Sequence, residues 1–446
     1  TCTRGTRRIH RTRTRRGAGA GGARARFVMP EAAMTMEEAL KVAGWPRSLS
    51  EPDKAPRMLH TTQELTEALL TGEHVDEIMV FKDGVNALQQ AAAVPTKLLL
   101  AARTQRSTRA FMSSLEDEML KALRARVYCT EIQKRDEFEL KKAADGSELD
   151  TLHDKWQALR ASEEQDSTVY IAELRRVNKY RHPLDGRWAK TVLNSDIKDW
   201  VGRSRAEAMP YWDRYDEGIF VGGRFSGSPM HVDQVIWSNV GKNFCGCKLL
   251  VIWPYGEPSR ELFDEHNYSL FTPPLRPTET AALEKACKVA LLTPGDVVLF
   301  SGGNAHMALS ISDELSLTAY ESFVNLNTRN LNAFLDTGSQ RQYQQCRARR
   351  PMLEDIKLDV VDVVEDLEAD LADETLDDKL IKAMAPSAIE TMLSDKFIAS
   401  KLRRARSASQ FSCGRLCEKC EEAVEPEAAE ASTRSAAAGG ANPTPL

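Results

Sequence analysis

The chain has 446 residues, which is enough for one large enzyme domain with appendages or for two domains. Its formal net charge of −5 gives no general attraction to nucleic acid, and no apolar run reaches the roughly 18 residues that a membrane-spanning helix needs. Nine cysteines, odd in number and scattered, are typical of reduced thiols. These features predict an intracellular protein, cytoplasmic or nuclear, with no clear nucleic-acid or membrane partner.

Residues 1–28 are expected to be disordered, because this segment is rich in Arg and contains no acidic residue. Three interpretations stay open. The segment could be a mistranslated stretch upstream of a true start at Met29, Met34 or Met36. It could be a transit peptide, which would place the protein in an organelle. It could also be a basic tail that binds nucleic acid or directs nuclear import.

Residues 37–200 are expected to form a mainly helical N-terminal region. The sequence TTQELTEALLTG predicts a capped amphipathic helix that ends at Gly72, and VDEIMVF at 75–81 predicts a strand. Residues 111–180 predict a long helical region, because leucines recur at helical spacing among Glu, Lys and Arg. A GxGxxG or Walker loop is absent, so the sequence does not indicate a nucleotide cofactor.

The tripeptide HVD occurs twice, at 74–76 and at 231–233, and in a strand its two outer side chains would point the same way. A third histidine follows each copy. His153 lies in a charged stretch with helical spacing, whereas His306 follows two apolar runs, a Pro-Gly-Asp turn and a Gly-Gly bend, and opens an alternating strand. The context therefore favours the second copy as a metal site.

His231, Asp233 and His306 would make a 2-His-1-carboxylate triad, which is typical of non-haem iron oxygenases. Such a triad leaves positions open on Fe(II), so that one ion can hold a bidentate oxo-acid and still bind oxygen. A structural histidine in the core remains the alternative for His306.

The segment 218–323 resembles a JmjC-type domain of the cupin-like 2-oxoglutarate oxygenases, and its pattern is closest to the asparaginyl hydroxylase of hypoxia-inducible factor. The matching pieces are GIFVGGRFSGSPMHVD, NVGKNFCGCKLLVIWPYGE and LLTPGDVVLFSGGNAHMALSI. The resemblance implies an α+β fold with a double-stranded β-helix (jelly-roll, cupin) catalytic core at 201–335, flanked by N- and C-terminal helices. It also implies that His231, Asp233 and His306 bind Fe(II).

The resemblance further implies four residues that hold the cosubstrate 2-oxoglutarate, namely Lys248, Ser228, Asn239 and Thr318. Lys248 would bind the distal carboxylate, and its strand, KLLVIW, is apolar enough to be core. A lysine there is expensive unless an anion pairs with it. The alternatives are a Lys248 side chain that reaches the surface and a Ser228 that serves as a turn residue.

Residues 353–400 predict an acidic amphipathic helical region, and residues 401–446 a disordered tail. The resemblance suggests that the helical region makes a homodimer; a helix that caps its own domain is the alternative. In the tail, Cys413, Cys417 and Cys420 could hold zinc, but no later histidine offers a fourth ligand. Disordered reduced thiols are therefore the default expectation.

The sequence thus predicts an Fe(II)- and 2-oxoglutarate-dependent oxygenase, with hydroxylation of a protein substrate favoured because no chromatin-reading finger is evident. A JmjC-type lysine demethylase and a catalytically silent cupin that serves as a scaffold are the alternatives. A metal-dependent isomerase or sugar-binding cupin would call on more histidine ligands than this segment offers.

Overall fold

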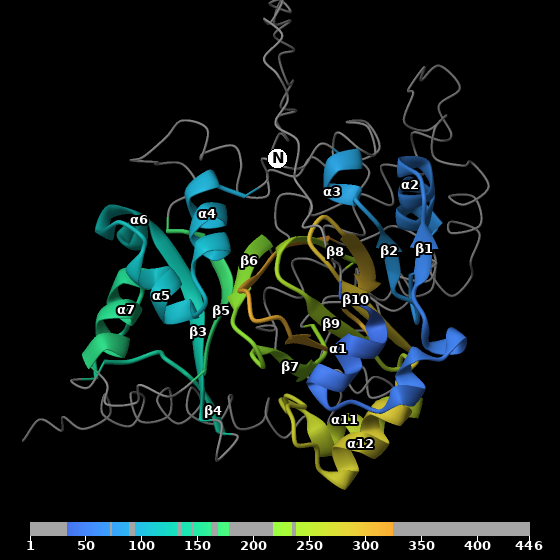
Figure 1. The fold of residues 1–446 in the computed structure, drawn as a ribbon. Coiled ribbons are helices and arrows are strands. Elements are labelled where there is room, and N and C mark those ends of the chain that lie inside the picture. The colour runs from blue at the N-terminus through green and yellow to red at the C-terminus, as the bar shows by residue number, and fades with distance from the viewer. Residues whose placement is uncertain are drawn as a thin grey trace, which may run out of the picture.

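The computed structural model describes residues 34–71, 74–88, 94–131, 136–143, 146–161, 168–177, 217–233 and 238–323. The predicted leader, the acidic helical region, the tail and the cysteine cluster lie outside these residues. The described part is a mixed α+β structure in which a nine-stranded and a four-stranded sheet are surrounded by helices (Figure 1).

Eight strands between 217 and 323 are shared between the two sheets. They are β6 (Glu217–Gly222), β7 (Gly227–His231), β8 (Ser238–Cys245), β9 (Lys248–Ile252), β10 (Lys288–Leu292), β11 (Val297–Ser301), β12 (His306–Ser310) and β13 (Ser316–Phe323). The four-stranded sheet has the order β10-β9-β12-β7, and the large sheet contains the run β11-β8-β13-β6. All of these neighbours pair antiparallel.

The N-terminal part of the chain extends the large sheet at both ends. The added strands are β1 (Arg57–Leu59) and β2 (Met79–Phe81) beyond β11, and β5 (Thr168–Arg176), β3 (Leu123–Glu131) and β4 (Asp136–Glu139) beyond β6. The strand predicted at 75–81 is present only over its last three residues, as β2, and it is preceded by a turn at 74–76. The prediction of a long helical region over 111–180 is wrong along β3, β4 and β5.

The alternation along β3 explains this error. Val127 and Cys129 are buried in a core cluster, whereas Arg126, Tyr128 and Thr130 line a cavity on the other face of the sheet. Charged side chains at a cavity wall mimic the solvated face of a helix, and the two-residue period is then hard to recognise. The strand conformation depends on pairing with β5, whose residues lie 38 to 53 positions later in the sequence than their partners on β3.

The helices are short and cover the outer faces of the sheets. They are α1 (Met36–Ala43), α2 (Thr62–Thr71), α3 (Gly84–Ala87), α4 (Thr96–Thr104), α5 (Thr108–Ser113), α6 (Asp117–Ala122), α7 (Leu152–Ala161), α11 (Arg260–His266) and α12 (Pro277–Glu284), with 3₁₀ turns at Arg47–Ser50, Pro52–Lys54 and Glu257–Ser259. The helix predicted from TTQELTEALLTG is α2. Among the described residues, none of the helices has the length and apolar character required to cross a membrane.

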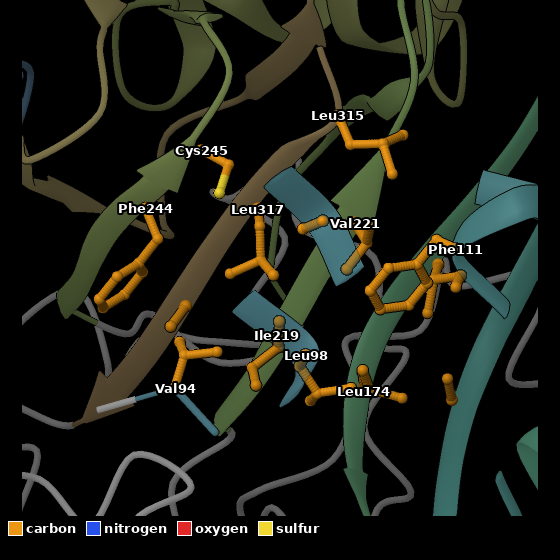
Figure 2. Close-up of a cluster of buried hydrophobic side chains, with 14 of the residues drawn as sticks. Val94, Leu98, Phe111, Leu174, Ile219, Val221, Phe244, Cys245, Leu315 and Leu317 are labelled. Carbon is orange, nitrogen blue, oxygen red and sulfur yellow. The ribbon is translucent and has the colours of Figure 1, made fainter. Parts of the chain in front are cut away.

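Three apolar clusters position the sheets. On the outer face of the large sheet, Ile219 and Leu317 pack with Leu98 and Phe111 of α4 and α5 (Figure 2). On the outer face of the small sheet, α1, α11 and α12 cover Trp253 and its neighbours (Figure 1), and the Trp253 indole Nε1 donates to a carbonyl of α12. The third cluster joins inner-face residues of both sheets and fills one part of the space between them.

Candidate metal centre and cosubstrate pocket

Two neighbouring strands bring the triad together. His231 is the last residue of β7 and His306 is the first residue of β12, and the two residues are paired in register. Their ring centroids are 4.2 Å apart. Asp233 follows β7 by two residues, and its backbone N–H donates to the carbonyl of Gly302 at 3.0 Å. The antiparallel pairing of β7 with β12 thus brings the three candidate ligands together, although they are far apart in sequence.

The candidate ligand atoms converge on one point. Nε2 of His231 lies 3.5 Å from Oδ1 of Asp233, and Nε2 of His306 lies 3.8 Å from the same oxygen. All three ligand atoms are within 4.8 Å of one another, and no other group of three His, Cys, Asp or Glu side chains in the described ranges has this geometry. Such distances suit one ion with bonds of about 2 Å.

Backbone carbonyls orient both imidazole rings. Nδ1 of His231 lies 2.7 Å from the carbonyl of Pro229, and Nδ1 of His306 lies 2.8 Å from the carbonyl of Asn304. A carbonyl only accepts, so each Nδ1 carries the hydrogen and each Nε2 keeps its lone pair for a metal. Burial, helped by the nearby His231, lowers the pKa of His306 to about 4, so this ring is neutral at pH 7.

The Asp233 carboxylate is held from its far side. Oδ2 accepts a hydrogen bond from Nδ2 of Asn239 at 2.7 Å, and Asn239 in turn accepts from the Ser322 hydroxyl. Burial alone would raise the pKa of Asp233, but His306, His231 and the Asn239 hydrogen bond outweigh it and leave this pKa below its usual range. Asn239 was expected beside the cosubstrate; it lines the cavity, and its side chain holds the candidate metal ligand Asp233 in place.

Replacing Gly302 by alanine should weaken metal binding by about ten- to a hundredfold, which is the usual effect of disturbing the support of a ligand. A Cβ atom at Gly302 would lie 2.0 Å from Oδ2 of Asp233, so the carboxylate would have to move. Gly223→Ala is the matched control, since its Cβ would meet only a leucine methyl at 3.9 Å. Cobalt titration of both variants tests the expectation, and equal affinities would contradict it.

The triad opens into a cavity of about 940 Å³. Of the residues predicted from the sequence, those that line it are His231, Asp233, His306, Lys248, Ser228 and Asn239. Thr318 is the exception, because its hydroxyl donates to Oδ1 of Asn243 at 3.0 Å. Its strand, β13, contributes Tyr320 and Ser322 to the cavity instead, so the expectation of a cosubstrate contact from Thr318 is not supported.

Lys248 is buried in this cavity wall. Its side chain is 0% exposed, and within the part of the chain that the structure describes its Nζ has neither a hydrogen-bond partner nor a counter-ion. The alternative of a lysine that reaches the surface is therefore excluded. Burial lowers the pKa of Lys248 to about 7. A buried ammonium without a counter-ion is strongly unfavourable. An anionic ligand bound beside Lys248 would offset the desolvation free energy of this charge.

Tyr170 was missed by the sequence reasoning, because it lies on β5 in the region predicted as helix. Its hydroxyl is 3.1 Å from the Ser228 hydroxyl, and Nζ of Lys248 lies 5.9 Å from its ring centroid. Two hydroxyls and one ammonium thus face the same part of the cavity. The alternation in TVYIAEL was the one sequence signal that could have revealed this strand.

Aromatic rings connect the two ends of the site. Phe300 contacts His306 with ring centroids 5.1 Å apart, and also contacts Tyr320 at 6.2 Å. Tyr320 contacts Phe220 at 5.2 Å, and Phe220 contacts Tyr170 at 6.3 Å. This apolar surface between the triad and Lys248 suits the hydrocarbon chain of a ligand that has a polar group at each end.

A charged wall extends the cavity beyond the eight central strands. Arg126 on β3 pairs with Glu139 on β4 at 2.9 Å, and Arg175 pairs with Glu173 on β5 at 2.9 Å. Burial would lower the pKa of Arg126, but its hydrogen bond to Glu139 and the acidic groups nearby together outweigh this effect and raise the pKa. All four side chains line the cavity, and each arginine is paired with a glutamate, so this wall is polar and its charges are balanced.

The first HVD copy has a different environment. His74 is fully buried, with Nε2 lying 2.8 Å from the Ser238 hydroxyl, and Asp76 accepts hydrogen bonds from later parts of the chain. His153 lies on α7, as the helical spacing around it predicted. No protein-family model and no curated protein matches this chain, so its function has to be inferred from the site.

Proposed function

We propose that this chain is an oxygenase that depends on Fe(II) and 2-oxoglutarate and has a JmjC-type jelly-roll core. The order in which β6 to β13 alternate between the two sheets supports a jelly roll, in which eight strands form two facing four-stranded sheets. The sheets are not closed into a barrel, and the large one continues into β1, β2, β3, β4 and β5.

The observation that carries the proposal is the pairing of two features in one cavity. A His-Asp-His cluster whose Nε2 atoms face one another opens into the same space as a buried lysine that has no hydrogen-bond partner among the described residues. 2-Oxoglutarate has two matching ends, an oxo-acid group that chelates a metal and a distal carboxylate that needs a cation. A bound ferrous ion would supply the redox chemistry that activates oxygen.

Each of the chain's own residues then has a defined role. His231, Asp233 and His306 hold the metal, with their orientation fixed by backbone carbonyls and by Asn239. Lys248 binds the distal carboxylate. The aromatic rings exclude water from the space between. The overall reaction converts 2-oxoglutarate, oxygen and a C–H bond into succinate, carbon dioxide and a C–OH group.

We further propose a protein substrate, because the balanced charged wall on β3, β4 and β5 offers both donors and acceptors, as a polypeptide requires. Hydroxylation of a side chain is our first choice. Lysine demethylation uses the same step on an N-methyl carbon, where the hydroxylated product loses formaldehyde. Mass spectrometry of treated peptides separates the two, since one reaction adds 16 Da and the other removes 14 Da.

Cobalt and 2-oxoglutarate together should raise the melting temperature of the purified protein by more than cobalt alone. A ligand that binds only the folded state stabilises it by about 2.7 kcal/mol at a hundred times its dissociation constant. Succinate lacks the oxo-acid chelate and should give a smaller shift. A melting temperature that is indifferent to both ligands would favour the catalytically silent scaffold.

A further inference from the structure

The HVD at 74–76 lies against the polypeptide that supports the metal centre. Oδ1 of Asp76 accepts a hydrogen bond from the backbone N–H of Tyr255 at 2.6 Å and another from Nδ2 of Asn304 at 2.8 Å. Its neighbour His74 reaches Ser238 at the start of β8. The segment before β2 therefore contacts three segments that are more than 160 residues away in sequence.

Asn304 connects Asp76 to the metal ligand His306. The Asn304 side chain is fully buried, and its Nδ2 donates both to Asp76 and, at 2.9 Å, to the carbonyl of Trp253. The backbone carbonyl of the same residue accepts the Nδ1 hydrogen of His306. The position of that carbonyl sets the direction in which Nε2 of His306 points. Anything that fixes Asn304 therefore fixes the ligand ring.

We propose that Asp76 is a positioning residue for His306, acting through Asn304. This inference rests on the proposed function, because it assumes that the triad binds a metal. A carboxylate is suited to the task, since hydrogen bonds to an ionised acceptor are shorter and stronger than neutral ones. The first HVD copy is thus a support of the metal centre rather than a second one.

The test is a titration of the full chain with cobalt, which reports affinity and, through its visible absorption, ligand geometry. Asp76→Ala should weaken cobalt binding about tenfold and alter the absorption spectrum, because loss of an outer partner costs ten- to a hundredfold in metal affinity. Asp76→Asn keeps an oxygen acceptor and should restore most of the affinity. If Asp76→Ala does not fold, Asp76→Asn is measured instead; it should still alter the absorption spectrum, because a neutral acceptor holds Asn304 less firmly than a carboxylate does.

Asp154→Ala is the matched control for a purely structural aspartate. Asp154 accepts hydrogen bonds from the backbone and hydroxyl of Thr151 at the start of α7, away from the triad. Its loss should lower the melting temperature of the metal-free protein and leave the cobalt affinity unchanged. If Asp76→Ala only destabilised the fold, it would show the same pattern as this control, namely a lower melting temperature and an unchanged cobalt affinity.

A double mutant tests the route through Asn304. Asn304→Ala keeps the backbone carbonyl that accepts the hydrogen of His306, but it removes the side-chain amide that donates to Asp76. The double variant with Asp76→Ala should bind cobalt no more weakly than the worse single variant, because both changes break one chain of contacts. Wild-type affinity and spectrum in Asp76→Ala would overturn the inference. A wild-type protein that binds no cobalt would instead overturn the proposed function.

Discussion

Replacing Lys248 by methionine should weaken 2-oxoglutarate binding by about ten- to a hundredfold, while cobalt binding stays within about twofold of wild type. A hydrogen bond to a charged group contributes roughly 1.5–3 kcal/mol, and methionine keeps the volume of the side chain without the charge. Calorimetric titration of the cobalt-loaded protein measures the effect. Unchanged affinity would mean that another residue binds the distal carboxylate.

The same substitution should stabilise the ligand-free protein. Among the residues that the structure describes, the Nζ atom of Lys248 has no hydrogen-bond partner, so methionine removes a buried charge and leaves no counter-ion behind. Lys242 on β8 is the matched control: it is equally buried, but it lies 3.2 Å from Glu321. Lys242→Met should destabilise the protein, because it leaves Glu321 buried without its cation. Opposite shifts in melting temperature are therefore expected for the two variants.

The affinity for 2-oxoglutarate should also depend on pH. The free protein has Lys248 with a pKa of about 7, and only the protonated form attracts the carboxylate. Affinity should therefore be constant below pH 7 and fall by up to about tenfold for each pH unit above it, since one proton must then be taken up on binding. In Lys248→Met, the affinity for 2-oxoglutarate should not show this fall above pH 7. Any pH dependence that remains in the variant would then come from metal binding.

Asp233→Ala should reduce succinate formation to background. Given ferrous ion, ascorbate, oxygen and 2-oxoglutarate, the wild-type protein is expected to form succinate and carbon dioxide slowly without a substrate, with ascorbate supplying the two electrons that reduce the second oxygen atom to water. Asp233 is the only anionic member of the triad. Its removal weakens the metal site, because the two histidines that remain offer no negative charge to the cation.

His306→Ala should have the same effect by opening the triad, and His153→Ala on α7 should have none. Succinate is measured by mass spectrometry after incubation with matched amounts of iron. Turnover that survives the loss of Asp233 would point to free iron in solution. Absence of succinate from a wild-type protein that binds both metal and 2-oxoglutarate would favour a binding module over an enzyme.

Local sequence patterns determined the identity of the candidate ligands. The HVD at 231–233 was separated from its twin at 74–76 by the strand signals around His306, which come from neighbouring residues whose spacing fixes which side chains share a face. Lys248 was expected from the resemblance to JmjC-type domains, and the apolar strand that it opens supported the expectation. The helix α2 and the strand β2 were predicted from the spacing of neighbouring residues.

Tertiary structure decided which distant segments complete the site. Tyr170 and the charged wall belong to strands that exist through their pairing with β6 and with one another, and half-buried charges hid their alternation. Thr318 faces Asn243 because the register of β13 against β8 is fixed by pairing along the whole sheet. Asp76 meets Asn304 across 228 positions of sequence. Strand register, and contacts between residues this far apart in the sequence, depend on the packing of whole elements. The spacing of neighbouring residues does not determine them.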